Sequence, residues 1–336
     1  MIHFLFLYYL SVIFILVSKW RQQRKMILPI INKNMLRRFF DIFVEQSLIL
    51  TDKLENVALN KSEIFFFEYI SERILCTSCA TLMDIKLETS SISQFLEAME
   101  RIDKTLYDIL MGSSQKEKFV QDDFTKVLYN NTIFMLLATS ETNAITLNFL
   151  TFVLANFSEI QEKVYKELLE IYGTKTPKAT PIKYEDLQRM NYLENVIKET
   201  MRLFPVVPLI ARELTEDLNI GEIILPKGAD VILQLMTMHR NEKYWPNPLV
   251  FDPDRFLPEN IGTSNSSYMP FSLGPRNCIG MEYAMISLKV FLSTLVRTFV
   301  FKIDKSIPID EIKFNYGVML NFAEPIKIRI EKRDLD

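Results

Sequence analysis

Phe271-Ser-Leu-Gly274-Pro-Arg276-Asn-Cys278-Ile-Gly280 is the stretch that decides the fold of this chain, and it carries one of only three cysteines. Pro275 and the two glycines predict a loop, because they allow tight turns and a close approach of the backbone. Apolar residues then recur at helical spacing from Met281 to Phe299, which predicts a helix. Cys278 is therefore expected just ahead of a helix N-terminus, where the dipole and the free N–H groups favour a thiolate over a thiol.

A thiolate in apolar surroundings needs a nearby cation, and a haem iron is a suitable one. A lone cysteine in a turn is more often an inert buried side chain, so the assignment of Cys278 depends on all ten residues of the stretch. The string resembles the haem-binding loop of the cytochrome P450 superfamily, Phe-x-x-Gly-x-Arg-x-Cys-x-Gly, and matches all of its fixed positions. The resemblance implies that Cys278 is the axial thiolate ligand of the iron of haem b. It also implies that the haem is held by Phe271, Gly274, Arg276 and Gly280, with Arg276 able to pair with a propionate.

Composition limits the class of protein. The chain has 336 residues, of which 49% are hydrophobic and 24% charged, so it can bury a large core. A net charge of −3 suggests no nucleic-acid partner. Three cysteines without an even framework indicate a reducing compartment, and the pair Cys76-x-x-Cys79 lies on a helical segment without the pattern of a metal or redox site. Two histidines, His3 and His239, nearly exclude a multi-histidine metal centre.

Residues 1–18 are apolar and carry no acidic or strongly basic side chain. As a helix they would be roughly 27 Å long, just enough to cross the hydrocarbon core of a bilayer. Lys19, Arg21, Arg24 and Lys25 follow at once, which predicts a lumenal N-terminus and a cytosolic remainder. We therefore expect a membrane anchor at 1–18 and a catalytic domain at 19–336 facing the cytosol from the endoplasmic reticulum of microsomes, with a buried core helix as the alternative for 1–18.

Further segments resemble the same superfamily. Trp20-x-x-x-Arg24 is similar to the family's C-helix pair, which implies that both side chains and the downstream Arg212 reach haem propionates. Residues 122–155 resemble the helix that crosses the haem, and the resemblance implies that its acid–alcohol pair, Glu141 and Thr142, relays protons during O2 activation. Thr139 stands where the family usually has glycine, so it fills part of the space for oxygen.

Glu199-x-x-Arg202 places an acid and a base on one helical face, and it resembles the family's K-helix motif. Arg255, in Phe251-Asp-Pro-Asp-Arg-Phe256, matches the arginine to which that pair is tied. The resemblance implies one buried ionic network, although Glu-x-x-Arg by itself describes many surface ion pairs.

The remaining pattern predicts mainly helices with a small β region. We expect a helix at 158–172 that ends at Gly173, another at 184–204, and an extended segment at 205–212. Alternating residues predict a hairpin of 218–225 with 230–236 around Pro226–Gly228, and two strands in the tail from 316 to 330. By resemblance this is a P450 fold that lacks the N-terminal helices and sheet and most of the F–G lid, of which only residues 92–111 could supply a helix.

The implied function is that of a haem-thiolate monooxygenase, closest to microsomal fatty-acid-hydroxylase-like members of insect type. Its partners would be O2, a lipophilic small molecule, the membrane, and NADPH–cytochrome P450 reductase with cytochrome b5 as a further electron donor. Lys25 and Lys289 are candidates for the docking face. Two other functions stay open, a non-catalytic haem-binding remnant of an incomplete chain and an oxygen-independent haem-thiolate isomerase or dehydratase.

Overall fold

The computed structural model describes residues 17–60, 62–87, 121–260 and 267–333. Its α-helices are α2 (Val17–Ile27), α3 (Lys33–Leu59), α4 (Phe66–Met83), α6 (Gln121–Asn156), α7 (Ser158–Tyr172), α8 (Asn191–Leu203), α9 (Leu235–His239) and α10 (Met281–Thr298). Short 3-10 helices are η1 (Leu28–Ile31), η2 (Tyr184–Gln188), η3 (Pro253–Phe256) and η5 (Ile309–Glu311). The expectation of a mainly helical fold with a small β region is confirmed.

The strands are few and short. They are β1 (Glu63–Phe65), β2 (Leu209–Glu213), β3 (Leu218–Ile220), β4 (Ile223–Leu225), β5 (Asp230–Gln234), β6 (Phe299–Lys302), β7 (Phe314–Tyr316), β8 (Leu320–Phe322) and β9 (Lys327–Lys332). They form an antiparallel sheet in the order β1-β9-β6 and three antiparallel pairs, β2-β5, β3-β4 and β7-β8. Each sheet is therefore an accessory to the helical core.

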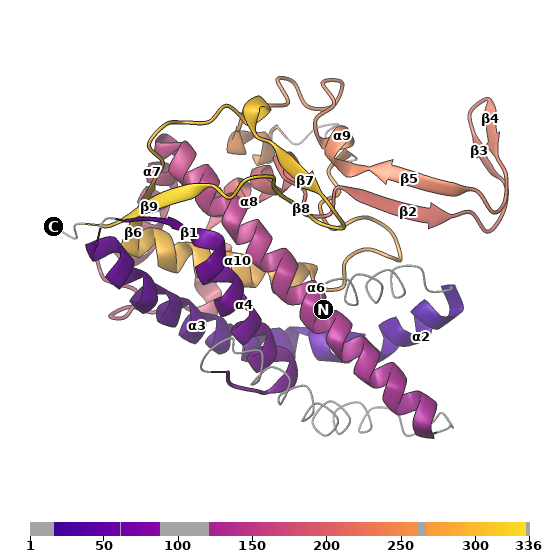
Figure 1. Ribbon diagram of the computed structural model, residues 1–336, viewed down its shortest axis with the longest axis horizontal. Coiled ribbons are helices and arrows are strands. Elements are labelled where there is room, and N and C mark those ends of the chain that lie inside the picture. Colours follow the sequence, from indigo (N-terminus) through magenta and orange to yellow (C-terminus); the bar gives the residue numbers. More distant parts are fainter. Residues whose placement is uncertain (1–16, 61, 88–120, 261–266, 334–336) are drawn as a thin grey trace.

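Helix α6 runs through the middle of the body, with α3 and α4 on one side and the strands β7 and β8 toward the other (Figure 1). Its side chains Leu147, Phe149 and Leu150 are almost completely buried. The ring of Phe149 lies 5.2 Å from that of Phe204 and 4.8 Å from that of Phe322, so α6 is packed against both the end of α8 and β8. Burial of each such side chain stabilises the fold by roughly 1.5–3 kcal/mol.

The start of α10 is fixed by one tyrosine. The ring of Tyr283 packs edge-on against Phe43 and Phe39 of α3, at centroid distances of 4.9 and 6.1 Å. Its hydroxyl lies 2.9 Å from Oγ1 of Thr81 on α4. Two helices therefore hold the first turn of α10, directly behind the stretch 271–280, which we call the cysteine loop.

Two sequence-based expectations about local structure are wrong, and one is confirmed. The segment 184–204 is not one helix, because η2 is followed by a break at Met190 before α8 begins. The segment 218–225 is itself a hairpin that turns at Gly221, whose φ of 62° suits glycine, while β5 pairs with β2. The two strands expected in the tail from 316 to 330 are present as β8 and β9, and β7 lies just ahead of them.

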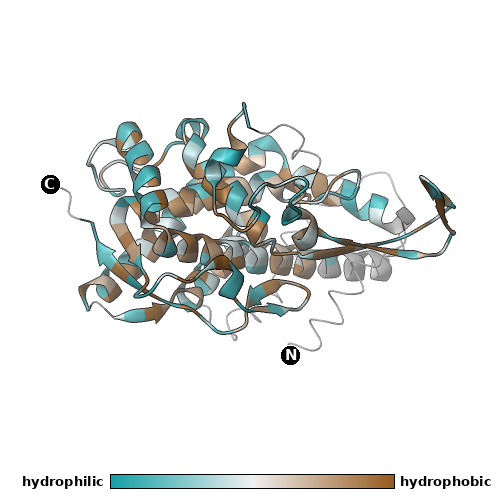
Figure 2. Ribbon diagram, turned by 90° about the horizontal axis from the view of Figure 1, so that it is seen from above, coloured by the Kyte–Doolittle hydropathy of each residue, from teal (hydrophilic) through white to brown (hydrophobic). Residues whose placement is uncertain are grey.

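The β2-β5 ribbon with the β3-β4 hairpin at its tip forms an arm that projects from one end of the body (Figure 1). Figure 2 shows apolar residues along this arm outside the main body. Ile220, Ile223, Ile224 and Ile232 each expose more than half of their surface. The arm therefore presents apolar side chains to solvent.

The membrane anchor expected at 1–18 and the lid helix expected at 92–111 fall almost entirely outside the described residues. Within the part of the chain that the structure describes, Asn131–Asn156 of α6 is the one helical stretch long and apolar enough to cross a bilayer. More than half of its most apolar window is buried, so it behaves as the core helix of the fold.

Candidate active site

The cysteine loop closes on itself before α10 begins. The backbone N–H of Cys278 donates to the carbonyl of Phe271 at 2.8 Å, and that of Asn277 donates to Gly274 at 3.0 Å. Ser272 and Gly274 have φ values of 61° and 77°, which is the left-handed region that glycine adopts readily and serine does not. These tight turns hold Cys278 three residues ahead of the first helical residue, as the sequence predicted.

The Cys278 thiol is accessible to solvent and takes part in no disulfide. It is nevertheless closely surrounded by protein, and this desolvation raises the pKa of Cys278, while the Gly280 N–H and the charge of Arg24 act in the opposite direction. The free N–H at the start of α10 thus favours the thiolate, as expected, but desolvation outweighs it in the protein by itself. An accessible sulfur in desolvated surroundings fits a metal cation placed directly on it, because only a strong local cation would make its anion stable there.

Trp20 and Arg24 on α2 both meet the cysteine loop. Arg24 donates from Nη1 to the carbonyl of Asn277 and from Nη2 to its Oδ1, each at 2.8 Å. The guanidinium of Arg276 lies 4.9 Å from the centre of the Trp20 ring, and that of Arg24 lies 5.8 Å from it. The structure thus brings together four of the residues that the sequence assigned to the haem environment, including Cys278.

Arg212 on β2 approaches the same place from a third part of the sequence. Burial lowers the pKa of Arg276, and repulsion from Arg212 lowers it further, so the two guanidinium groups are neighbours. Arg212 donates from Nη1 to the carbonyl of Ala211 at 2.7 Å. Several guanidinium groups beside one thiol fit a ligand that carries carboxylates, because an anion relieves their mutual repulsion. The residues present therefore fit haem, whose propionates are such carboxylates.

On α6, the acid–alcohol pair lies in an uninterrupted α-helix. The Thr142 hydroxyl donates to the carbonyl of Ala138 at 2.6 Å, and the Asn143 amide donates to the carbonyl of Thr139 at 2.8 Å. The side chain of Glu141 is exposed, yet the protein around it still desolvates its carboxyl group and raises the pKa of Glu141. A carboxyl group with a raised pKa exchanges protons more readily near neutral pH, which is what a relay requires.

The side chains of Glu199, Arg202 and Arg255 lie close together. Arg202 donates from Nε and Nη2 to the two carboxylate oxygens of Glu199 at 2.7 and 2.8 Å, and neither side chain has exposed surface. The Asp252 N–H donates to the same carboxylate at 2.9 Å. Nε of Arg255 lies 3.4 Å from Glu199 Oε1 without hydrogen-bond alignment. The structure therefore places the three residues together, as one buried ionic cluster.

Lys289, expected on the docking face, is buried instead. Its ammonium donates to the carbonyl of Leu187 at 2.8 Å and to Glu194 at 2.6 Å, so it joins α10 to η2 and α8. Lys25 is exposed, as that expectation requires. Cys76 and Cys79 are buried, and desolvation raises the pKa of Cys79 to about 12, which suits inert thiols.

Two residues were missed by the sequence analysis. Asn277 accepts hydrogen bonds from both terminal nitrogens of Arg24. It occupies a variable position of the motif 271–280, so the motif did not single it out. His239, whose imidazole accepts a hydrogen bond from the backbone N–H of Met269 at 2.9 Å, was considered only as a metal ligand. The chain has only two histidines, and that rarity could have marked His239 as a residue with a specific role.

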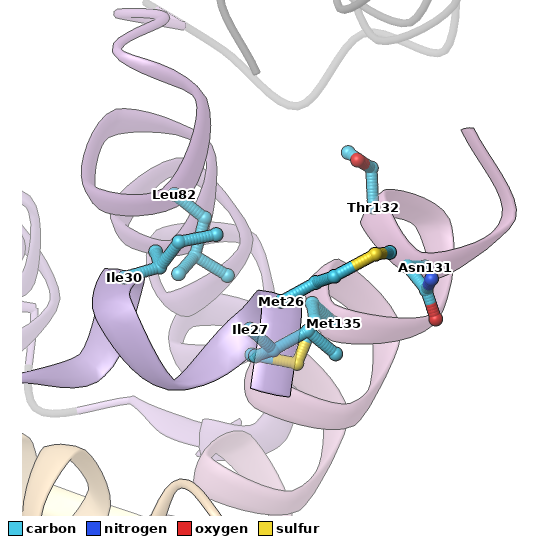
Figure 3. A pocket seen from close by; sticks show the side chains of 7 residues that line it. All are labelled: Met26, Ile27, Ile30, Leu82, Asn131, Thr132 and Met135. Carbon is cyan, nitrogen blue, oxygen red and sulfur yellow. The ribbon is translucent and has the colours of Figure 1, made fainter. Parts of the chain in front are cut away.

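A small cavity lies where α2, η1, α4 and α6 meet (Figure 3). Its volume is about 20 Å³, and its walls are mostly apolar, formed by Met26, Ile27, Ile30, Leu82, Asn131, Thr132 and Met135. A space of that size holds about one water molecule. The cavity therefore has no room for haem or for a lipophilic substrate.

Comparison with known proteins gives a consistent result. The sequence profile described as Cytochrome P450 matches residues 101–328, which is more than half of the chain. Cytochrome P450 4V2 of Pongo abelii is 30% identical over a match that covers 95% of this chain and 73% of that protein. Cytochrome P450 4V2 of Mus musculus is also 30% identical, covering 84% of this chain and 66% of that protein. Cytochrome P450 4g15 of Drosophila melanogaster is 35% identical over 67% of this chain and 38% of that protein.

Proposed function

Because the chain belongs to the cytochrome P450 superfamily, whose members are monooxygenases that bind haem through an axial cysteine thiolate, we propose that it inserts one oxygen atom from O2 into a lipophilic small molecule. Electrons would come from NADPH through a flavoprotein reductase. The observation that carries the proposal is the accessible Cys278 thiol in desolvated surroundings beside several guanidinium groups.

Haem, when bound, supplies O2 binding and activation, and the thiolate tunes it. The residues of this chain do the rest. Cys278 would hold the iron, and Arg276 and Arg212 would pair with the propionates, while Trp20 lies against Arg276 at the edge of the site. Arg24 keeps the loop in place through Asn277, so the sulfur does not have to be positioned by haem alone.

Proton delivery is assigned to α6. Glu141 would take protons from solvent, because its side chain is exposed and its pKa is raised. Thr142 would pass them on, and its hydroxyl is already oriented by the carbonyl of Ala138. The hydrogen bond to the helix backbone fixes the hydroxyl proton, so transfer through Thr142 requires that hydroxyl to rotate.

The substrate would be apolar. The segment after α8 and the tail strand β8 meet, since the N–H of Leu320 donates to the carbonyl of Val206 at 2.8 Å. Val206 and Val207, in the first of these segments, are only half-buried. Apolar side chains with few polar groups suit a lipophilic molecule such as a fatty acid, a hormone or a xenobiotic. The apolar sequence of residues 1–18 supports a place on the endoplasmic reticulum membrane.

The test begins with the iron ligand. The purified protein is loaded with haem, reduced and exposed to carbon monoxide, and we expect the red-shifted Soret band of thiolate ligation. Cys278→Ala should abolish that band, whereas the control Cys76→Ala should keep it, because Cys76 is buried on α4. An unchanged band in Cys278→Ala would overturn the assignment.

Turnover is then measured with reductase, NADPH and O2 on a panel of lipophilic compounds. Product that needs both NADPH and O2 supports the monooxygenase, and product without reductase supports an isomerase or dehydratase. Haem binding without any product would favour the non-catalytic alternative. Thr139→Gly, which opens space on α6 at a helix-propensity cost of about 0.3 kcal/mol, should raise the product formed per NADPH.

A further inference from the structure

His239 joins two parts of the molecule that the sequence keeps apart. It is the last residue of α9, and its side chain has no exposed surface. Its Nε2 accepts the backbone N–H of Met269 at 2.9 Å, just ahead of the cysteine loop. An imidazole nitrogen that accepts carries no proton, so this bond requires the neutral side chain with its proton on Nδ1.

The backbone of His239 faces the ionic cluster. Its carbonyl accepts Nη1 of Arg202 at 2.7 Å, and Arg202 is bound in turn to Glu199. One residue thus connects the buried ions of α8 with the segment that leads to Cys278 and to the proposed haem.

The bond to Met269 is the first in a short backbone series that ends at the cysteine. The Met269 carbonyl accepts the N–H of Ser272 at 3.0 Å, and the Phe271 carbonyl accepts the N–H of Cys278 at 2.8 Å. The ring of Tyr268 lies 5.6 Å from that of His239, and its hydroxyl donates to the carbonyl of Lys198 at 3.0 Å. The start of the cysteine loop is therefore attached to the α8 region. The backbone hydrogen bonds of the loop make the position of Cys278 depend on that attachment.

We propose that His239 is a positioning residue for Cys278, whose neutral imidazole holds the Met269 amide and so fixes the cysteine loop on the ionic cluster. The proposal rests on the proposed function in one respect, that Cys278 is the iron ligand. The loop attachment itself exists in the protein without haem.

The groups that face His239 oppose its protonation. Burial lowers the pKa of His239 to about 4, and the positive charges of Arg202 and Arg240 lower it as well, against the opposing effect of the Arg202 backbone on the imidazole. Tyr268 is neutral because burial raises its pKa well above 10. The carboxylate of Glu199 is engaged by Arg202. A proton on Nε2 would face the Met269 N–H, so the imidazolium cannot hold the loop.

The low pKa of His239 in the folded protein makes the fold less stable as the pH falls. The unfolded chain takes up the proton near pH 6.5, whereas the folded protein takes it up only near pH 4. Between these values the unfolded state binds one more proton, so folding loses about a factor of ten per pH unit as the pH falls. Above pH 6.5 the contribution of His239 to stability is fully present.

Two variants separate the hydrogen bond from the packing. His239→Gln places an amide oxygen near the position of Nε2, where it can accept the Met269 N–H, and it has no charge to gain. His239→Asn is a matched control, because its shorter side chain reaches only the position of Nδ1. Both replace a ring by a carboxamide, so a role in packing alone predicts similar behaviour for the two variants.

The first measurement is hydrogen exchange of the peptide that contains Met269 in the haem-free protein at neutral pH. We expect His239→Asn to lose about tenfold of the protection, the factor expected for one hydrogen bond, and His239→Gln to keep it. A peptide from the middle of α10 should not differ among the three proteins. Equal exchange in the two variants would overturn the proposal.

The second measurement is the thiolate band of the reduced carbon monoxide complex from pH 8 to pH 3.5, a range that includes the pH near 4 at which the folded protein protonates His239. The wild-type protein should lose the band on acidification, His239→Gln should retain it to lower pH, and His239→Asn should have less of it throughout. Identical pH profiles for wild type and His239→Gln would count against His239, and this comparison still decides if His239→Asn does not fold. If no form binds haem, the proposed function fails, and the exchange measurement tests His239 independently.

Discussion

Removal of the Glu199 carboxylate is the perturbation whose effect the structure defines best. Glu199 has no exposed surface and accepts two hydrogen bonds from Arg202 and one from the Asp252 N–H. Glu199→Ala deletes the acceptor and leaves the guanidinium of Arg202 buried. That guanidinium then keeps the carbonyls of His239 at 2.7 Å and Val250 at 3.4 Å and lies 5.1 Å from the centre of the Trp245 ring, and none of these partners is an anion.

The size of the effect follows from this geometry. Removing one partner of a buried ion pair costs about 3–5 kcal/mol, against a total free energy of unfolding of about 5–15 kcal/mol for a typical domain. Arg255→Ala should cost less, about 1–2 kcal/mol, because Arg255 is 13% exposed and lies 3.4 Å from the carboxylate without alignment. The double variant should be little worse than Glu199→Ala, since both changes remove the same contact.

The assay is guanidinium-induced unfolding of each variant, compared at a common slope. Arg37 and Glu185 supply a matched control, because their ion pair is as short, at 2.6 Å, but the side chains are 66% and 67% exposed. Glu185→Ala should leave the midpoint nearly unchanged, since water and salt screen such pairs. If Glu199→Ala shifted the midpoint no more than Glu185→Ala, the argument from burial would be refuted.

Three further predictions concern other contacts. In the native haem-free protein, a thiol reagent should modify Cys278 first, since Cys76 and Cys79 are buried; mass spectrometry that finds either of them modified first would contradict this. Lys289→Ala should destabilise the fold, because it removes one of the two lysine partners of Glu194 and frees the Leu187 carbonyl, but should leave the Michaelis constant for the reductase unchanged. Arg24→Ala should weaken haem affinity several-fold through the loss of both bonds to Asn277, measured by haem titration, whereas unchanged affinity would mean that the loop holds itself.

The parts that sequence could predict were those set by local pattern. The amphipathic helix α7 begins and ends where its periodicity and Gly173 placed it. The ten-residue motif located Cys278, and spacing placed Glu199 beside Arg202. In each case the determining residues lie within one or two turns of each other.

The break before α8 could not be predicted in that way. The N–H groups of Tyr192 and Leu193 are capped by the carboxylate of Glu167, at 2.6 and 2.9 Å. That carboxylate belongs to α7, so the start of α8 is determined by a residue from another helix. No property of the segment 184–204 alone contains this information, and its continuous apolar periodicity suggested one helix.

Burial of lysine is a similar case. Lys289 occupies a polar position of α10, and sequence alone suggested a solvated charge. The structure places Glu194 and the Leu187 carbonyl around it, so its ammonium is satisfied inside the protein. Charge pattern indicates which side chains are ionised, and only the fold shows which of them face water.

The projecting arm has a practical consequence for anyone who handles the protein. Its strands have free backbone edges, and its isoleucines at 220, 223 and 224 lie in solvent. Such edges can pair between molecules, so concentrated samples should form oligomers whose size rises with protein concentration and falls with mild detergent. Ile224→Lys, which puts a charge on this edge, should keep the protein monodisperse in size-exclusion chromatography without touching the cysteine loop.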